Sequence, residues 1–185
     1  FFFKQKTAYE IPKRDWSSDV CSSDLYEQYS DVGNNYFYSA FQNEEVISLH
    51  IRRGDYLQFS HHPTQPIEYY AKALKFFDTN LKVLIFTDDI EWARAQDLFK
   101  HERFFFSTKN YNAVDMYMQT LCSYHIIANS TFSWWGAWLA NSKRVLKPRK
   151  WFGPPIDHYD DFLNVEGRSE EHTSELQSRF GISYA

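Results

Sequence analysis

Four side chains able to bind or transfer charged groups stand together at the end of a short apolar run. In residues 46–56 (VISLHIRRGDY) the first half is typical of a buried strand, and the second half brings His50, Arg52, Arg53 and Asp55. A guanidinium offers paired planar donors to phosphate oxygens and keeps its charge at any accessible pH. The pattern predicts a diphosphate site at a strand's carboxyl end, where open α/β sheets bind ligands. The alternative is a surface ion pair between either arginine and Asp55.

Two further polar clusters follow apolar runs. Thr87, Asp88 and Asp89 come after residues 83–86, and residues 129–133 (NSTFS) come after 125–128. Asp88 has capping-box spacing to Glu91, which predicts a helix from residue 90 to about residue 100. Because parallel strands end at one edge of a sheet, all three clusters are expected to line one cleft.

Strands and helices alternate along the chain. Further strands are expected at 104–107 and 144–146, and Ile67, Tyr70, Ala71, Leu74 and Phe77 fall on one helical face after Pro66. Asp115 is expected to cap another helix, and Ser133 to start the last one. This order predicts an α/β fold, a Rossmann-like parallel sheet with helices on both faces.

Composition places the chain among globular proteins. It has 185 residues, of which 43% are hydrophobic and 19% aromatic. The formal charge of -4 gives no reason to expect nucleic acid or an anionic membrane as partner. No apolar run is long enough to span a bilayer.

The two ends differ from the rest. The peptides DWSSDVCSSDL (15–25) and RSEEHTSELQS (168–178) can be encoded by one short DNA word read on opposite strands. That coincidence indicates a translated sequencing-library adapter, with residues 1–11 as its continuation. Residues 1–25 and 168–185 are therefore expected to be artefacts, leaving 26–167 as the native part. The alternative is a genuine Ser/Asp-rich linker and an acidic tail.

Four stretches together resemble the α-1,2-fucosyltransferases of glycosyltransferase family 11. They are HIRRGDY (50–56), IFTDDIEWAR (85–94), DMYMQTLCSYHIIANSTFSWWGAWL (115–139) and KPRKWF (147–152), in order and covering nearly all of 46–152. The resemblance implies metal-independent, inverting transfer of L-fucose from GDP-β-L-fucose to the 2-hydroxyl of a terminal galactose in a glycan. It implies no cofactor, because GDP-fucose is the donor substrate.

The resemblance also implies an architecture. Such enzymes have two facing Rossmann-like lobes, the GT-B type, and residues 26–167 correspond to the C-terminal donor lobe. The chain is then an incomplete fragment without much of the acceptor site. In a bacterium the enzyme would work in the cytoplasm or on the cytoplasmic face of the membrane.

Residue roles carry over by position. Arg52 is expected to hold the diphosphate and to stabilise the charge that builds on it, and Arg53 is a weaker candidate. His50 with Asp88 or Asp89 matches guanine-binding positions, although either aspartate could serve only as a helix cap. A metal held by the aspartate pair is the less favoured alternative, since arginine fills that role.

The remaining candidates have simpler alternatives. Asp55 is a possible general base for the acceptor hydroxyl, or a structural partner of Arg53. Ser130, Thr131 and Ser133 could bind phosphate at a helix start, or Thr131 or Ser133 could simply cap it. Phe132 or Trp135 could flank the fucose. The other assignments are structural: packing for Trp134, Trp135 and Trp138, and an exposed loop for His61 and His62.

Other function classes remain open at this point. A non-catalytic nucleotide-binding lobe would show the same arginine strand. Another GDP-fucose-dependent transferase, of α-1,6 or protein O-fucosyl type, shares that strand but is less consistent with the NSTFSWWGAWL string at 129–139.

Overall fold

The fold is built on one parallel sheet. The computed structural model describes residues 18–108, 112–154 and 183–184. Its strands are β1 (Val46–Ile51), β2 (Lys82–Thr87), β3 (Phe104–Phe106), β4 (Tyr124–Ile126), β5 (Arg144–Lys147) and β6 (Ser183–Tyr184). All pair in parallel, in the order β3-β2-β1-β4-β5-β6, with β1 inside the sheet between β2 and β4. The predicted parallel α/β sheet is confirmed, whereas β6 was not predicted.

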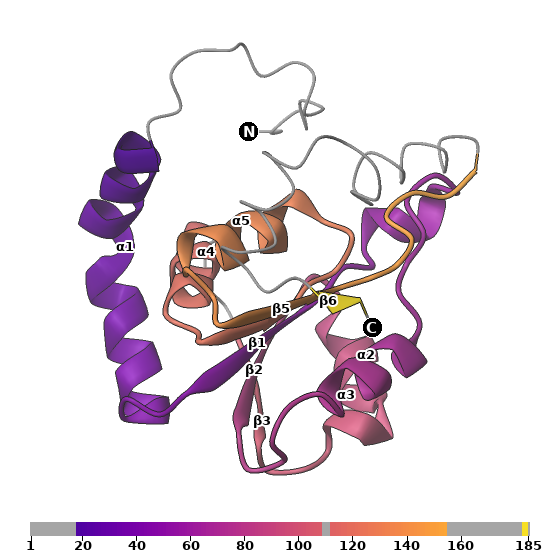
Figure 1. The fold of residues 1–185 in the computed structure, drawn as a ribbon, viewed down its shortest axis with the longest axis horizontal. Helices are drawn as coiled ribbons and strands as arrows, with labels where there is room; N and C mark the ends of the chain where they lie inside the picture. Colours follow the sequence, from indigo (N-terminus) through magenta and orange to yellow (C-terminus); the bar gives the residue numbers. More distant parts are fainter. Residues whose placement is uncertain (1–17, 109–111, 155–182, 185) are drawn as a thin grey trace.

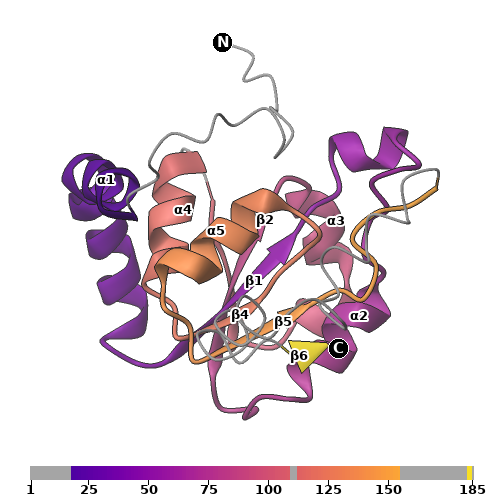
Figure 2. The same cartoon turned by 45° about the horizontal axis from the view of Figure 1, so that its top comes forward.

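Helices cover both faces of this sheet. They are α1 (Ser18–Phe41), α2 (Ile67–Leu74), α3 (Ile90–Ala95), α4 (Asn112–Thr120) and α5 (Thr131–Leu139), with short 3-10 turns η1 (Asp55–Gln58) and η2 (Asp97–Phe99). Figures 1 and 2 show α2 and α3 on one face and α1, α4 and α5 on the other. The predicted arrangement of a sheet between two helical layers is therefore confirmed.

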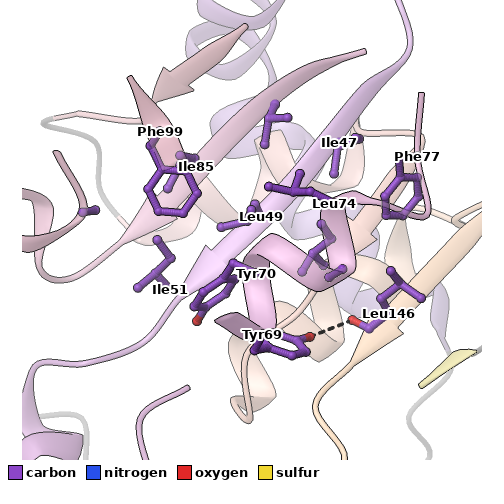
Figure 3. Packing of buried hydrophobic residues seen from close by; sticks show 14 residues of the cluster. Ile47, Leu49, Ile51, Tyr69, Tyr70, Leu74, Phe77, Ile85, Phe99 and Leu146 are labelled. Carbon is purple, nitrogen blue, oxygen red and sulfur yellow. Dashed lines mark hydrogen bonds between the residues drawn. The ribbon is translucent and has the colours of Figure 1, made fainter. Parts of the chain in front are cut away.

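Strand β1 contributes side chains to the hydrophobic cores on both faces of the sheet, because successive side chains of a strand point to opposite faces. Ile47, Leu49 and Ile51 are fully buried against α2 and its neighbours (Figure 3). Val46 points into the other core, formed with α1 and α4. Burying one such side chain contributes about 1.5–3 kcal/mol, so β1 is fixed in register and its carboxyl end is held rigidly.

Helix α1 forms in a segment whose sequence has no clear hydrophobic period. It runs from Ser18, through part of the segment attributed to an adapter, to Phe41. It packs closely on α4, where a Cβ built at Gly33 would lie 2.4 Å from Tyr117 Cδ1. The Tyr117 hydroxyl donates to Asn34 Oδ1 at 3.0 Å. Only glycine permits this approach of the two helices.

Helix α3 begins at Ile90 as predicted, but two predicted capping residues were wrong. Asp88 does not cap α3; Asp89 does, accepting from the Trp92 N–H at 3.1 Å. Asp115 does not cap α4 either, since that helix begins at Asn112 and the Asp115 carboxylate accepts from the Ser107 hydroxyl at 2.6 Å. In both cases the predicted capping carboxylate is bound to a group elsewhere in the fold, so it does not cap the helix.

Helix ends also differ from expectation. Helix α2 begins after Pro66 and stops at Leu74, before Phe77. Helix α3 ends at Ala95 and not near residue 100, because Gln96 turns to an extended conformation and its side chain donates to the Trp92 carbonyl. This break lets Phe99, in η2, enter the core.

A buried histidine, His125, makes the free energy of unfolding depend on pH. Burial lowers the pKa of His125 to about 4, while its Nε2 donates to the Gln119 carbonyl at 3.0 Å. The unfolded chain takes up this proton near pH 6.5, so between the two values it binds more protons than the folded protein. The free energy of unfolding should fall by about 2 kcal/mol from pH 7 to pH 5 through this residue alone.

Urea unfolding of His125→Gln at both pH values tests this expectation. The variant should lose less stability on acidification than the parent chain, and the exposed His101→Gln should behave like the parent. An acid loss of unchanged size in His125→Gln would contradict the assignment.

Candidate active site

Arg52 lies just past β1 between two carboxylates. Its Nη2 is 2.7 Å from Asp55 Oδ1, and its Nη1 is 2.9 Å from Asp88 Oδ2. The Arg52 side chain is 26% exposed, and Asp55 is the more exposed acid, at 43% against 25% for Asp88. Both partners come from strand ends, Asp55 after β1 and Asp88 after β2. The guanidinium is therefore held at the carboxyl edge of the sheet in one orientation.

Arg53 is engaged differently. Its Nε lies 3.1 Å from Asp89 Oδ2, and its guanidinium sits 3.9 Å from the Trp92 ring centroid. Asp89 is the residue that caps α3, so Arg53 ties β1 to the start of that helix. Asp55, the partner predicted for Arg53, pairs with Arg52 instead, because the Arg53 side chain points toward α3.

Asp88 is the central acceptor of the site. Its Oδ1 accepts from the Arg53 backbone N–H at 2.9 Å, while its Oδ2 pairs with Arg52. A Cβ built at Gly54 would lie 2.6 Å from Asp88 Oδ2. The RRGD turn thus needs its glycine so that the backbone and this carboxylate can approach each other.

His50 is buried beneath the start of α5. It is 5% exposed, and its ring centroid lies 5.4 Å from that of Phe132. Burial, together with the nearby Arg52 charge, lowers the pKa of His50 to about 3, so it stays neutral at physiological pH. Its Nδ1 is buried and has no hydrogen-bond partner in the described part of the chain. Such an atom favours a polar ligand or water.

Tyr56 and Asn129 join the ends of β1 and β4. The Tyr56 hydroxyl donates to the Asn129 carbonyl at 3.1 Å. The Asn129 side chain donates to the carbonyls of Pro63 and Trp151 and accepts from Gln65 Nε2 at 3.1 Å. Sequence reasoning placed Asn129 only in a polar cluster and did not single out Tyr56 or Gln65, since only the fold shows that one amide connects three segments.

Ser130 caps α5, which corrects the predicted helix start at Ser133. The Phe132 N–H donates to Ser130 Oγ at 3.3 Å. The Ser133 hydroxyl is fully buried and donates to the Ser130 carbonyl. Thr131 is exposed in the first turn. Of the three predicted hydroxyls, that of Thr131 is the most accessible to a ligand.

The prediction that His61 and His62 are exposed is wrong, since both are partly buried, and His62 is the more closely packed. Its ring stacks on Tyr56, with centroids 4.9 Å apart and planes 18° apart, and its Nδ1 is buried. The predicted packing role of two tryptophans agrees with the structure: Trp134 and Trp138 lie stacked against a buried cluster that includes Ile127 and Trp151. Trp135 meets Trp134 edge-on.

Among the described residues no group of three or more His, Cys, Asp or Glu side chains is placed to hold a metal ion. In the same part of the chain no helix combines the length and apolar character needed to cross a bilayer.

A family model decides the relationship of this chain to known proteins. The model described as Glycosyl transferase family 11 matches residues 15–151. The chain belongs to this family. The resemblance inferred from the four stretches is thereby confirmed, and the chain is a glycosyltransferase-family chain with the arginine strand inside the matched region.

Curated relatives agree with this assignment. The chain is 40% identical over 124 residues to an O-antigen biosynthesis glycosyltransferase, WbnK, of Escherichia coli, covering 60% of this chain and 40% of the relative. It is 38% identical over 121 residues to an alpha-1,2-colitosyltransferase of E. coli, covering 57% and 41%. The chain therefore spans about two-fifths of the length of these relatives.

Solved structures give a weaker likeness. The NodZ alpha-1,6-fucosyltransferase soaked with GDP-fucose aligns with a TM-score of 0.45 at 17% identity, covering 66% of this chain and 43% of NodZ. NodZ from Bradyrhizobium gives a TM-score of 0.45 at 19% identity, with the same coverage.

The close approach at Gly54 gives a stability test. In Gly54→Ala the added methyl must displace the Asp88 carboxylate and break its pairing with Arg52, which we expect to cost about 1–3 kcal/mol of unfolding free energy. Urea denaturation of Gly54→Ala, Asp88→Ala and the double variant measures this as a cycle. In the Asp88→Ala background the glycine substitution should cost far less. Additive losses would show that Asp88 is not what the methyl meets.

Proposed function

We propose that this chain is the donor-binding part of an inverting, metal-independent fucosyltransferase that uses GDP-β-L-fucose and acts on the 2-hydroxyl of a terminal galactose. The observation that carries the proposal is the Arg52 guanidinium, partly exposed and fixed at the carboxyl end of β1 in a family 11 chain. The native donor lobe, of GT-B type, would be residues 26–167.

Arg52 has the properties that the leaving group requires. During transfer the acceptor oxygen bonds to the anomeric carbon as the bond to the β-phosphate breaks, and GDP leaves with the electron pair. A fixed guanidinium stabilises that growing negative charge. The diphosphate would displace Asp55 from Nη2, because Asp55 is the more exposed of the two carboxylates on Arg52. Asp88 then keeps the arginine in place.

The other donor contacts follow from their positions. His50, neutral and with an unpartnered Nδ1, would contact the guanine together with Asp88 or Asp89. Thr131 and the backbone N–H groups of the first turn of α5 would contact phosphate, whereas Ser130 and the fully buried Ser133 would hold that turn in place. Phe132 would flank the sugar. Arg53, locked between Asp89 and Trp92, would position the loop rather than bind phosphate directly.

Asp55 is the candidate general base among these residues. Once a diphosphate has taken its place on Arg52, its carboxylate is available to accept the proton of the attacking hydroxyl. The competing proposal is a base supplied from outside this donor lobe.

Calorimetric titration of the whole 185-residue chain with GDP, in a chelator, tests the donor site. We expect saturable binding that is weakened about 10- to 100-fold in Arg52→Ala, because a charge-assisted hydrogen bond is lost. Arg144→Ala is the matched control, since this exposed arginine starts β5 at the opposite edge of the sheet. Equal weakening in both variants, or no GDP binding by a folded parent chain, would refute the site.

Asp55→Asn gives a test of opposite sign. Removing the charge that competes for Arg52 should strengthen GDP binding by about two- to fivefold, the scale of a partly exposed ion pair. Asp97→Asn, which changes an exposed carboxylate on η2 paired with Lys100, should leave the affinity unchanged. Weaker binding in Asp55→Asn would mean that Asp55 itself supports the nucleotide site.

A second donor deserves comparison because one relative, at 38% identity, is an alpha-1,2-colitosyltransferase. Colitose is fucose without its 3-hydroxyl, so the two nucleotide sugars differ by a single polar group. Titration with GDP-fucose and GDP-colitose side by side would distinguish them. A tenfold preference for the fucosyl compound supports the first proposal, and the reverse preference supports the second.

A further inference from the structure

Tyr56 provides a platform beneath Arg52. The ring is 7% exposed, and its hydroxyl is tied to the Asn129 carbonyl. The Arg52 guanidinium carbon lies 5.1 Å from the ring centroid. The same ring is stacked on His62, at 4.9 Å between centroids and 18° between planes. One phenol thus contacts the key cation of the site and a histidine from the following loop.

His62 is itself well supported. Its backbone N–H donates to the Phe59 carbonyl at 3.1 Å, and its ring lies 5.9 Å from that of Phe152 and 4.6 Å from that of His61. Its Nδ1 is buried and unpartnered within the described residues. The ring is therefore held there by its aromatic contacts rather than by a hydrogen bond at that nitrogen.

The charge state of His62 suits this place. Burial lowers its pKa, the charges of His61 and Arg52 act in the same direction, and Asp55 opposes them. The neutral imidazole so favoured can stack on Tyr56 without repelling the guanidinium.

We propose that His62 is a positioning residue for Arg52. His62 holds the Tyr56 ring in the place where the Arg52 guanidinium lies over it. Asp55 and Asp88 restrain Arg52 only at its two Nη atoms, while Arg52 Nε is buried with no partner among the described residues. The ring restrains the guanidinium plane as well. That the fixed guanidinium then serves a diphosphate rests on the function proposed above.

Two substitutions separate stacking from other roles. His62→Phe keeps an aromatic ring on Tyr56 but cannot titrate or form hydrogen bonds, whereas His62→Ala removes the stack. The control is His101→Ala, at an exposed histidine before β3. Thermal unfolding of each variant checks that it is folded.

Nitrogen-15 NMR of the arginine Nε–Hε groups measures the positioning without any ligand, with Arg52→Lys identifying the Arg52 signal. In the parent chain this signal should be shifted upfield by the Tyr56 ring. It should stay shifted in His62→Phe and His101→Ala and collapse toward the average arginine position in His62→Ala. A shift retained in His62→Ala, or lost in His62→Phe, would overturn the proposal.

GDP titration of the same variants separates this inference from the proposed function. We expect His62→Ala to bind GDP about two- to tenfold more weakly, the scale of one aromatic contact, and His62→Phe to bind like the parent. If the folded parent binds no GDP while the NMR result is as expected, the positioning role stands and the donor function fails. If the parent binds GDP and His62→Ala keeps both the upfield shift and the GDP affinity, the donor function stands and the positioning role fails.

Discussion

The site depends on the Asp88 carboxylate, which holds two consecutive residues of the neighbouring strand end. One oxygen accepts from the Arg53 backbone N–H and the other pairs with the Arg52 side chain. The first contact fixes the path of the chain as it leaves β1, and the second fixes the direction of the guanidinium. Gly54 is required because this carboxylate occupies the space that a side chain would fill.

The two arginines show how identical side chains acquire different roles. The Arg53 side chain points toward α3 and contacts Trp92 and Asp89. Its charge therefore stabilises the packing of that helix on the sheet. Arg52 stays at the carboxyl edge of the sheet, and one of its two partners, Asp55, is 43% exposed. Exposed ion pairs contribute less to stability than buried ones, so the Arg52–Asp55 pair is the one that a ligand could replace at least cost.

The features that depend on local sequence pattern, the strands and the helical layers, could be predicted from the sequence. The alternation of apolar runs and amphipathic segments predicted five of the strands and both helical layers, and the polar strand ends identified Arg52 and Asp88. Cap positions failed at Asp88 and Asp115, because carboxylates with suitable spacing were already engaged by distant groups. The pairing of His62 with Tyr56 brings a loop onto a strand end, and no short-range periodicity records such a contact.

The burial of Asn129 has a consequence for how the protein can be produced. Asn129, Ser130 and Thr131 spell an acceptor sequence for N-linked glycosylation. The amide nitrogen of Asn129 already donates to two carbonyls, and the residue is 1% exposed. A glycan attached there before folding would remove these bonds and could not be enclosed. The folded protein therefore cannot carry a glycan at Asn129, and this acceptor sequence can be used only in a chain that has not reached the fold.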